Sequence, residues 1–171
     1  DPLCCVFPAR NDSMGPMAGP GVQLEGLTWP EAEEALASAT VVVVPLGARL
    51  KEHGRHLPLN NDWIMAEYLI RRVLECCEVL ATPTVQFGYY PAFVDYPGSI
   101  HLARETAGAL VADVCRSLAR HTDARFYVLN TGISTNWALE PMRLKLADEG
   151  LVVDYTDLRK AHSTLDVEQP R

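Results

Sequence analysis

The stretch of residues 39–62, ATVVVVPLGARLKEHGRHLPLNND, decides the fold. Its first part, Ala39 to Leu46, is a run of β-branched and apolar residues, typical of a strand buried on both faces of a sheet. A polar loop follows from Gly47 to Asp62, and apolar residues then recur at helical spacing from Trp63 to Leu74. Polar, titratable residues at the end of a buried strand are where an open α/β sheet usually places its ligand site.

The alternation of strand and helix continues through the rest of the chain. Upstream, a helix is predicted over residues 30–38, where Thr28 and Glu31 have the spacing of a capping box. Downstream, the patterns predict strands at 79–85, 125–129 and 152–155 and helices at 106–121, 141–149 and 156–171. This alternation predicts an α/β fold, with a mostly parallel sheet flanked by helices on both faces. Residues 1–26 are predicted to form an irregular N-terminal arm, and residues 27–171 the α/β domain.

Composition excludes several classes of partner. The 171 residues suffice for one domain with its own core, and the net charge of -7 argues against nucleic acid and anionic membranes as partners. The five cysteines lack a CxxC spacing, so we interpret them as free thiols rather than as a zinc site. The chain starts at Asp1 rather than at methionine, so both a cytoplasmic protein and one exported after signal cleavage fit the sequence.

Three polar loops follow the first three predicted strands. They cover residues 47–62, 88–98 and 130–136. Because the carboxyl ends of parallel strands meet at one edge of a sheet, we expect these loops to converge on a pocket.

The first loop carries side chains that bind metal ions. Glu52, His53, His56 and Asp62 are acceptable ligands for zinc, manganese or iron. A two-metal site would supply hydroxide near neutral pH and polarise a carbonyl group. Two structural alternatives remain open: Asp62 directly precedes a helix and fits an N-cap, and His56 fits a packed histidine that bonds to backbone.

The third loop and a histidine of the second loop complete the candidate site. The hydroxyls and amides of the third loop are placed to point into a pocket, and His101 lies close enough in sequence to the second loop to reach it. The predicted substrate-binding residues are His56, His101, Thr131, Ser134, Thr135 and Asn136.

Four sets of residues carry a resemblance to a known family. They are Leu27-Thr28-Trp29-Pro30-Glu31 with the strand 41–47, His53-Gly54-x-His56-Leu57-Pro58-Leu59 with Asp62, Tyr96-Pro97-Gly98-Ser99-Ile100 with Thr106, and Gly132 with Asn136. Together they resemble the creatininase (creatinine amidohydrolase) family over about Leu27 to Tyr155. The resemblance implies an α/β protein, often oligomeric, that binds two divalent metals and opens cyclic or linear amide bonds.

The same resemblance implies roles for four residues of the first loop. His53 is similar to a metal-ligand histidine of the family, and Asp62 to the carboxylate that bridges the two metals. Lys51 occupies the position of a ligand glutamate. Glu52, one place later, would serve as the third ligand or as the general base, and Lys51 would stabilise an oxyanion or bind a substrate carboxylate.

Other positions depart from the family pattern. Ile133 stands where the family has a ligand histidine, Thr135 where some members have an acidic ligand, and Phe93 where a loop histidine is often found. The usual two-metal centre cannot be assembled from these residues. The sequence also stops at Arg171, about where a later catalytic segment of the family would begin. We therefore expect a domain that is incomplete at its C-terminus, or one that a second chain completes.

The sequence thus predicts a creatininase-type hydrolase that acts on C–N bonds other than peptide bonds. It would use zinc, manganese or iron to hydrolyse a small-molecule amide, as a homo-oligomer. One alternative is a non-catalytic creatininase-like binding or scaffold protein, which fits Lys51 and Ile133. Another is a metal-free α/β protein that binds an anion at the turn of residues 132–135.

Overall fold

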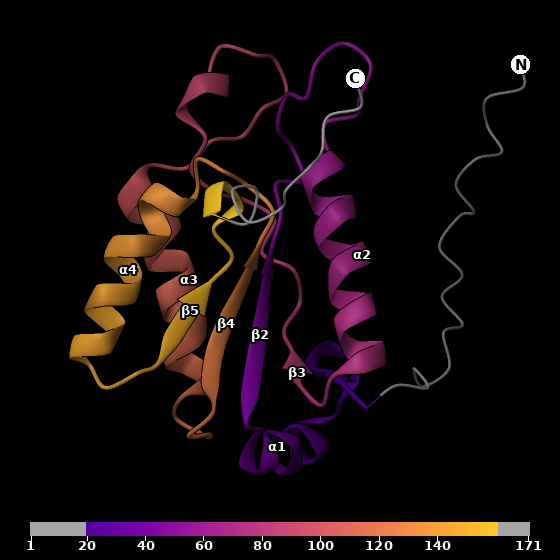
Figure 1. Ribbon diagram of the computed structural model, residues 1–171, viewed down its shortest axis with the longest axis vertical. Helices are drawn as coiled ribbons and strands as arrows, with labels where there is room; N and C mark the ends of the chain where they lie inside the picture. The colour runs from indigo at the N-terminus through magenta and orange to yellow at the C-terminus, as the bar shows by residue number, and fades with distance from the viewer. Residues whose placement is uncertain (1–19, 161–171) are drawn as a thin grey trace, which may run out of the picture.

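The apolar run that begins the stretch 39–62 forms strand β2 (Val41–Leu46). This strand lies at the centre of a parallel sheet (Figure 1). The computed structural model describes residues 20–160. Within them the sheet has five strands in the order β1-β3-β2-β4-β5, and every neighbouring pair is parallel. The other strands are β1 (Val22–Gln23), β3 (Leu80–Ala81), β4 (Arg125–Asn130) and β5 (Val153–Tyr155).

Helices cover both faces of the sheet, as predicted. They are α1 (Trp29–Ser38), α2 (Asn61–Cys76), α3 (Arg104–Leu118) and α4 (Asn136–Asp148). Because successive side chains of a strand point to opposite faces, β2 divides its valines between two cores. Val42 and Val44 belong to the larger core, with residues of α1, α3 and α4, whereas Val43 belongs to a smaller core with residues of α2. In Figure 1, α2 accordingly lies on one side of the sheet and α3 and α4 on the other.

Two predicted elements differ clearly in length from the observed ones. Helix α4 begins at Asn136 rather than at Pro141, so Pro141 lies inside the helix, beyond the first turn where proline is usually found. The strand predicted over residues 79–85 is ordered only at Leu80–Ala81, followed by a single bridge between Leu46 and Val85, as the internal Pro83 requires.

The boundary of the N-terminal arm at residue 26 stays a prediction, since residues 1–19 lie outside the described part of the chain. Strand β1 and a short 3-10 turn, Leu24–Gly26, already extend the ordered structure into this predicted arm. The predicted helical tail 156–171 lies mostly outside the described residues. Across residues 20–160, no helix is both long and apolar enough to cross a membrane.

The three polar loops meet at the carboxyl edge of the sheet, at the top of Figure 1. Backbone hydrogen bonds fix the start of the first and third loops to neighbouring parts of the chain. Gly47 N donates to Val85 O at 3.0 Å, and Thr131 N donates to Leu46 O at 3.0 Å. The loop after β2 is also fixed further out, where Ile100 N donates to Leu50 O at 2.9 Å. The convergence expected from the alternation of elements is therefore confirmed.

Candidate functional site

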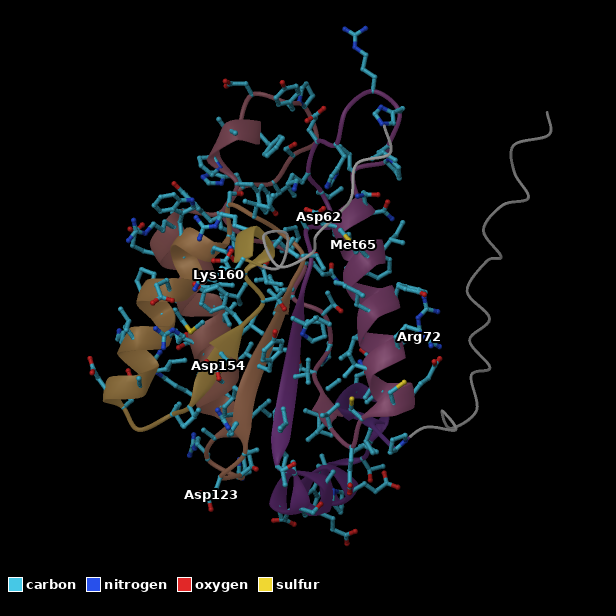
Figure 2. The ribbon with its side chains drawn as sticks, in the orientation of Figure 1. Asp62, Met65, Arg72, Asp123, Asp154 and Lys160 are labelled. Carbon is cyan, nitrogen blue, oxygen red and sulfur yellow. The ribbon has the colours of Figure 1, made fainter. Side chains whose placement is uncertain are left out.

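Asp62 lies at the centre of the convergence, in the first turn of α2 and 5% exposed. Figure 2 shows it at the upper end of this helix, at the opposite end of the molecule from Asp123. The helix starts at Asn61, so Asp62 is already inside it and is not the N-cap. Its carboxylate is held instead by two residues of the loop after β2, and the positive end of the helix dipole favours a negative charge at this position.

Lys51 is the first of these two residues. Its Nζ lies 2.5 Å from Asp62 Oδ2, and its side chain is only 13% exposed. The ammonium also lies over the rings of Phe93 and Tyr90, 5.1 Å and 5.9 Å from their centroids. Lys51 occupies the position at which the family resemblance implied a ligand glutamate. Its largely buried ammonium pairs there with the carboxylate of Asp62.

His53 is the second residue of this loop that contacts the carboxylate of Asp62. Its Nδ1 lies 2.7 Å from Lys51 O. Because a carbonyl oxygen can only accept a hydrogen bond, this contact assigns the proton of the neutral ring to Nδ1 and leaves a lone pair on Nε2. Nε2 lies 2.8 Å from Asp62 Oδ1, but without the angle of a hydrogen bond, so this buried nitrogen has no hydrogen-bond partner. With the ring neutral, Nε2 and Oδ1 are both acceptors, and a cation in contact with both atoms would satisfy them.

The predicted ligand set of Glu52, His53 and Asp62 is not assembled. Among residues 20–160 no three His, Cys, Asp or Glu side chains are grouped so that they could hold a metal. Glu52 is turned back on its own loop, where its Oε1 accepts a hydrogen bond from Gly54 N at 2.5 Å. Gly54 has a φ of +83°, a conformation that glycine adopts at little cost and that directs its N–H toward this carboxylate.

Two of the predicted substrate-binding residues have polar groups occupied inside the protein. The Thr131 hydroxyl donates to Asp62 O at 2.9 Å and to Leu46 O at 3.2 Å, and the residue is buried. Asn136, 1% exposed, donates to Asp157 Oδ1 at 2.7 Å. Both side chains hold the loops in place through these bonds, and substrate binding by them stays a prediction.

The neighbouring residues Ser134 and Thr135 differ in position. Thr135 lines a small cavity beside Asp62, and its hydroxyl donates weakly to Tyr89 O at 3.4 Å. Ser134 is half-buried in the same turn. Substrate binding by these two residues stays a prediction.

The two histidines that were predicted to bind substrate, His56 and His101, lie in different surroundings. His56 is exposed and lies next to Gly54 at the tip of the first loop. His101 accepts a hydrogen bond from Tyr90 N at its Nδ1, at 3.1 Å, and its ring packs against Tyr89 with centroids 5.3 Å apart. His101 therefore orders the second loop, and a direct substrate contact by either histidine stays a prediction.

Two residues of the site were missed by sequence reasoning. Tyr90 and Asn130 are 2% and 1% exposed and both line the cavity beside Asp62, which has room for about one water molecule. Burial raises the pKa of Tyr90, and the charge of Asp62 adds to this effect. Asn130 bonds Gly132 O and Asn136 Oδ1 through its amide nitrogen, at 2.7 and 2.8 Å. Asn130 is the last residue of β4 and the first residue of the predicted polar loop 130–136, a signal that could have placed it in the site.

A larger groove of about 800 Å³ lies over α4 and β5. Its charged side chains include two pairs, Arg143 with Glu140 and Arg159 with Asp157, at 2.8 and 3.1 Å. Since these charges neutralise each other, the smaller cavity, which is lined by Asp62 and lies where the three loops converge, is the better candidate site.

The sequence matches known proteins over most of its length. The profile of the creatininase family, described as creatinine amidohydrolase, matches residues 25–169. A creatinine amidohydrolase of Pseudomonas putida is 34% identical over 110 residues, which cover 61% of this chain and 42% of that protein. The chain thus spans less than half the length of this curated relative.

Solved structures give the same result for the fold. A mutant creatininase of the Zn–Zn type aligns with a TM-score of 0.68 and 26% identity, covering 86% of this chain and 60% of its own. A creatininase described with Mn aligns with a TM-score of 0.64 and 27% identity, covering 82% of this chain and 59% of its own. The α/β fold described above is therefore the fold of these proteins.

Proposed function

This chain belongs to the creatininase family, and from that premise we propose that it is a metal-dependent amidohydrolase that opens a cyclic or linear amide C–N bond of a small molecule. The family is of the amidohydrolase type. The relatives described above carry the names of amide hydrolases, which favours this reading over a non-catalytic binding or scaffold protein.

One observation carries the proposal. His53 Nε2 and Asp62 Oδ1 lie 2.8 Å apart in a buried site, and Nε2 has no hydrogen-bond partner. An imidazole whose other nitrogen donates to a backbone carbonyl is in the state that metal-binding histidines adopt. These two atoms fit one divalent cation, zinc or manganese, and the relatives of the Zn–Zn and Mn types support this choice. A third protein ligand is not supplied by residues 20–160.

A divalent cation in this position would supply Lewis acidity, which lowers the pKa of water and polarises an amide carbonyl. The residues of the chain contribute orientation and charge. Lys51 neutralises and fixes Asp62 Oδ2, and Thr131 holds the backbone of Asp62 through its carbonyl. A general-base role for Glu52, an iron cofactor and a homo-oligomeric state stay predictions.

The proposal is tested by removing metal with a chelator, dialysing the chain against Zn²⁺ or Mn²⁺, and measuring bound metal and hydrolysis of creatinine. We expect the wild type to retain metal and to hydrolyse the amide only when loaded. His53→Ala and Asp62→Asn should lose both properties, because each removes one of the two converging ligand atoms.

His121→Ala is the matched control, since this histidine is exposed in the turn between α3 and β4. It should retain wild-type metal content and turnover. Less than about a tenth of an equivalent of metal in the wild type, unchanged by His53→Ala, would refute the proposed function, because a catalytic metal site must be loaded in order to act.

A further inference from the structure

The buried ammonium of Lys51 occupies a position built for a cation. It meets a carboxylate oxygen on one side, with Nζ 2.5 Å from Asp62 Oδ2. Phe93 and Tyr90 place their ring faces 5.1 Å and 5.9 Å from it. A charge-assisted hydrogen bond and two aromatic faces all favour a positive charge at this point.

The second oxygen of the same carboxylate has different surroundings. Asp62 Oδ1 faces His53 Nε2, which belongs to a side chain only 10% exposed and has no hydrogen-bond partner. The carboxylate of Asp62 therefore has one oxygen paired with the ammonium of Lys51 and one oxygen beside a nitrogen that has no hydrogen-bond partner. Only the second position offers unused donor atoms to a metal.

A metal ion beside Oδ2 would compete with the ammonium for the same oxygen. The two positive charges would repel each other strongly, because a buried site screens charge less than water does. The ammonium is held in this position by its ion pair with Asp62 and by the two aromatic rings. A relative of the Zn–Zn type, by its description, has no such limit to a single metal.

We propose that Lys51 replaces one metal ion of the centre, so that this chain binds a single divalent cation, at Asp62 Oδ1 and His53 Nε2. The inference rests on the proposed function, because it assumes that these two atoms do bind metal. It goes further in assigning to Lys51 the role of a permanent cation and in fixing the stoichiometry at one.

The test uses Mn²⁺, whose paramagnetism reports on neighbouring ions as well as on binding. The full chain, stripped by chelator, is titrated with Mn²⁺ in equilibrium dialysis, and the bound metal is examined by electron paramagnetic resonance. We expect one Mn²⁺ per wild-type chain, with the six-line spectrum of an isolated ion. Lys51→Glu should raise the count to two and broaden the spectrum, because the two ions would share Asp62.

Two further variants keep the test decisive if Lys51→Glu does not fold. Lys51→Met retains an unbranched apolar stem against the aromatic rings but removes the charge, and we expect one Mn²⁺ bound about tenfold more tightly or better. Arg55→Met removes the same charge from an exposed position of the same loop and should leave both count and affinity unchanged.

Failure of this inference and failure of the proposed function give different results. Two Mn²⁺ per wild-type chain, together with metal-dependent hydrolysis, would overturn the inference and leave the proposed function intact. An affinity of Lys51→Met equal to that of the wild type would do the same. No bound metal in the wild type or in Lys51→Met would overturn both.

Discussion

Thr131 shows how a single hydroxyl ties the site together. It reaches two carbonyl oxygens, one at the end of β2 and one in the first turn of α2. Thr131→Val keeps the shape of the side chain and removes both bonds, so we expect a loss of about 1–2 kcal/mol in the free energy of unfolding. Urea denaturation followed by circular dichroism measures this loss.

Thr40→Val is the matched control for this prediction. Thr40 is exposed just before β2, at the amino end of the strand, so its replacement should change the free energy of unfolding by less than about 0.5 kcal/mol. Equal effects of the two substitutions would mean that the Thr131 hydroxyl contributes no net stability.

At the same scale, the sequence identifies the residues of the first loop but not the direction of their side chains. Asp62 and His53 were predicted together because both follow a buried strand, and the structure brings them together. Glu52 and Lys51 are adjacent, and nothing in their local pattern indicates which of them turns inward. The turn at Gly54 decides it, because its N–H binds the Glu52 carboxylate and leaves the inner position to Lys51.

At the scale of elements, the contact between β2 and α2 sets the position of Asp62. Gly47 follows β2 directly, and a Cβ at this residue would lie 2.5 Å from Asp62 O and 2.8 Å from Ala66 Cβ. Gly47→Ala therefore forces the start of α2 away from the strand. We expect a loss of about 1–3 kcal/mol in the free energy of unfolding and weaker metal binding than in the wild type.

Gly26→Ala serves as the control, since a Cβ at Gly26 meets nothing within 4 Å. It should leave the free energy of unfolding unchanged or raise it by about 0.4–1 kcal/mol, because the unfolded chain loses freedom. Thermal and urea denaturation of the two variants give the comparison. A stable Gly47→Ala protein with wild-type metal affinity would show that α2 can shift without disturbing the site.

Helices and strands were predicted correctly where a sequence pattern is compatible with only one kind of secondary structure. The run of β2 could only be a buried strand, and the capping box at Thr28 and Glu31 is confirmed by hydrogen bonds from Thr28 N and Oγ1 to Glu31 Oε2. The start of α4 was missed: the helix was predicted from Pro141, which lies inside the observed helix. Tertiary contacts of Asn136, invisible in the sequence, start the helix five residues earlier.

At the scale of the whole molecule, the sheet buries groups that must stay protonated. Cys115, on α3 against the larger core, is 0% exposed, and burial raises the pKa of its thiol from 9.0 to about 12. Burial, together with the hydrogen bond to Glu140, also raises the pKa of Tyr155, from 10.0 to about 12. Both groups ionise more readily in the unfolded chain than in the folded one.

The sign of the pH dependence follows from these shifts. Below pH 9 both groups are protonated in both states, and their contribution to stability is fully present. As the pH rises from 9 to about 12, the unfolded chain releases its thiol proton first, so Cys115 alone should lower the free energy of unfolding by about 1.4 kcal/mol per pH unit. Urea unfolding at pH 8, 9, 10 and 11 should show this decline.

Cys115→Ala separates the titration of the thiol from the packing of the core. The substitution leaves a small cavity, which lowers stability by the same amount at every pH. It also removes the ionisable group, so between pH 9 and 10 the variant should lose less stability per pH unit than the wild type. Parallel curves for the two proteins would mean that the thiol ionises as easily in the folded core as in the unfolded chain.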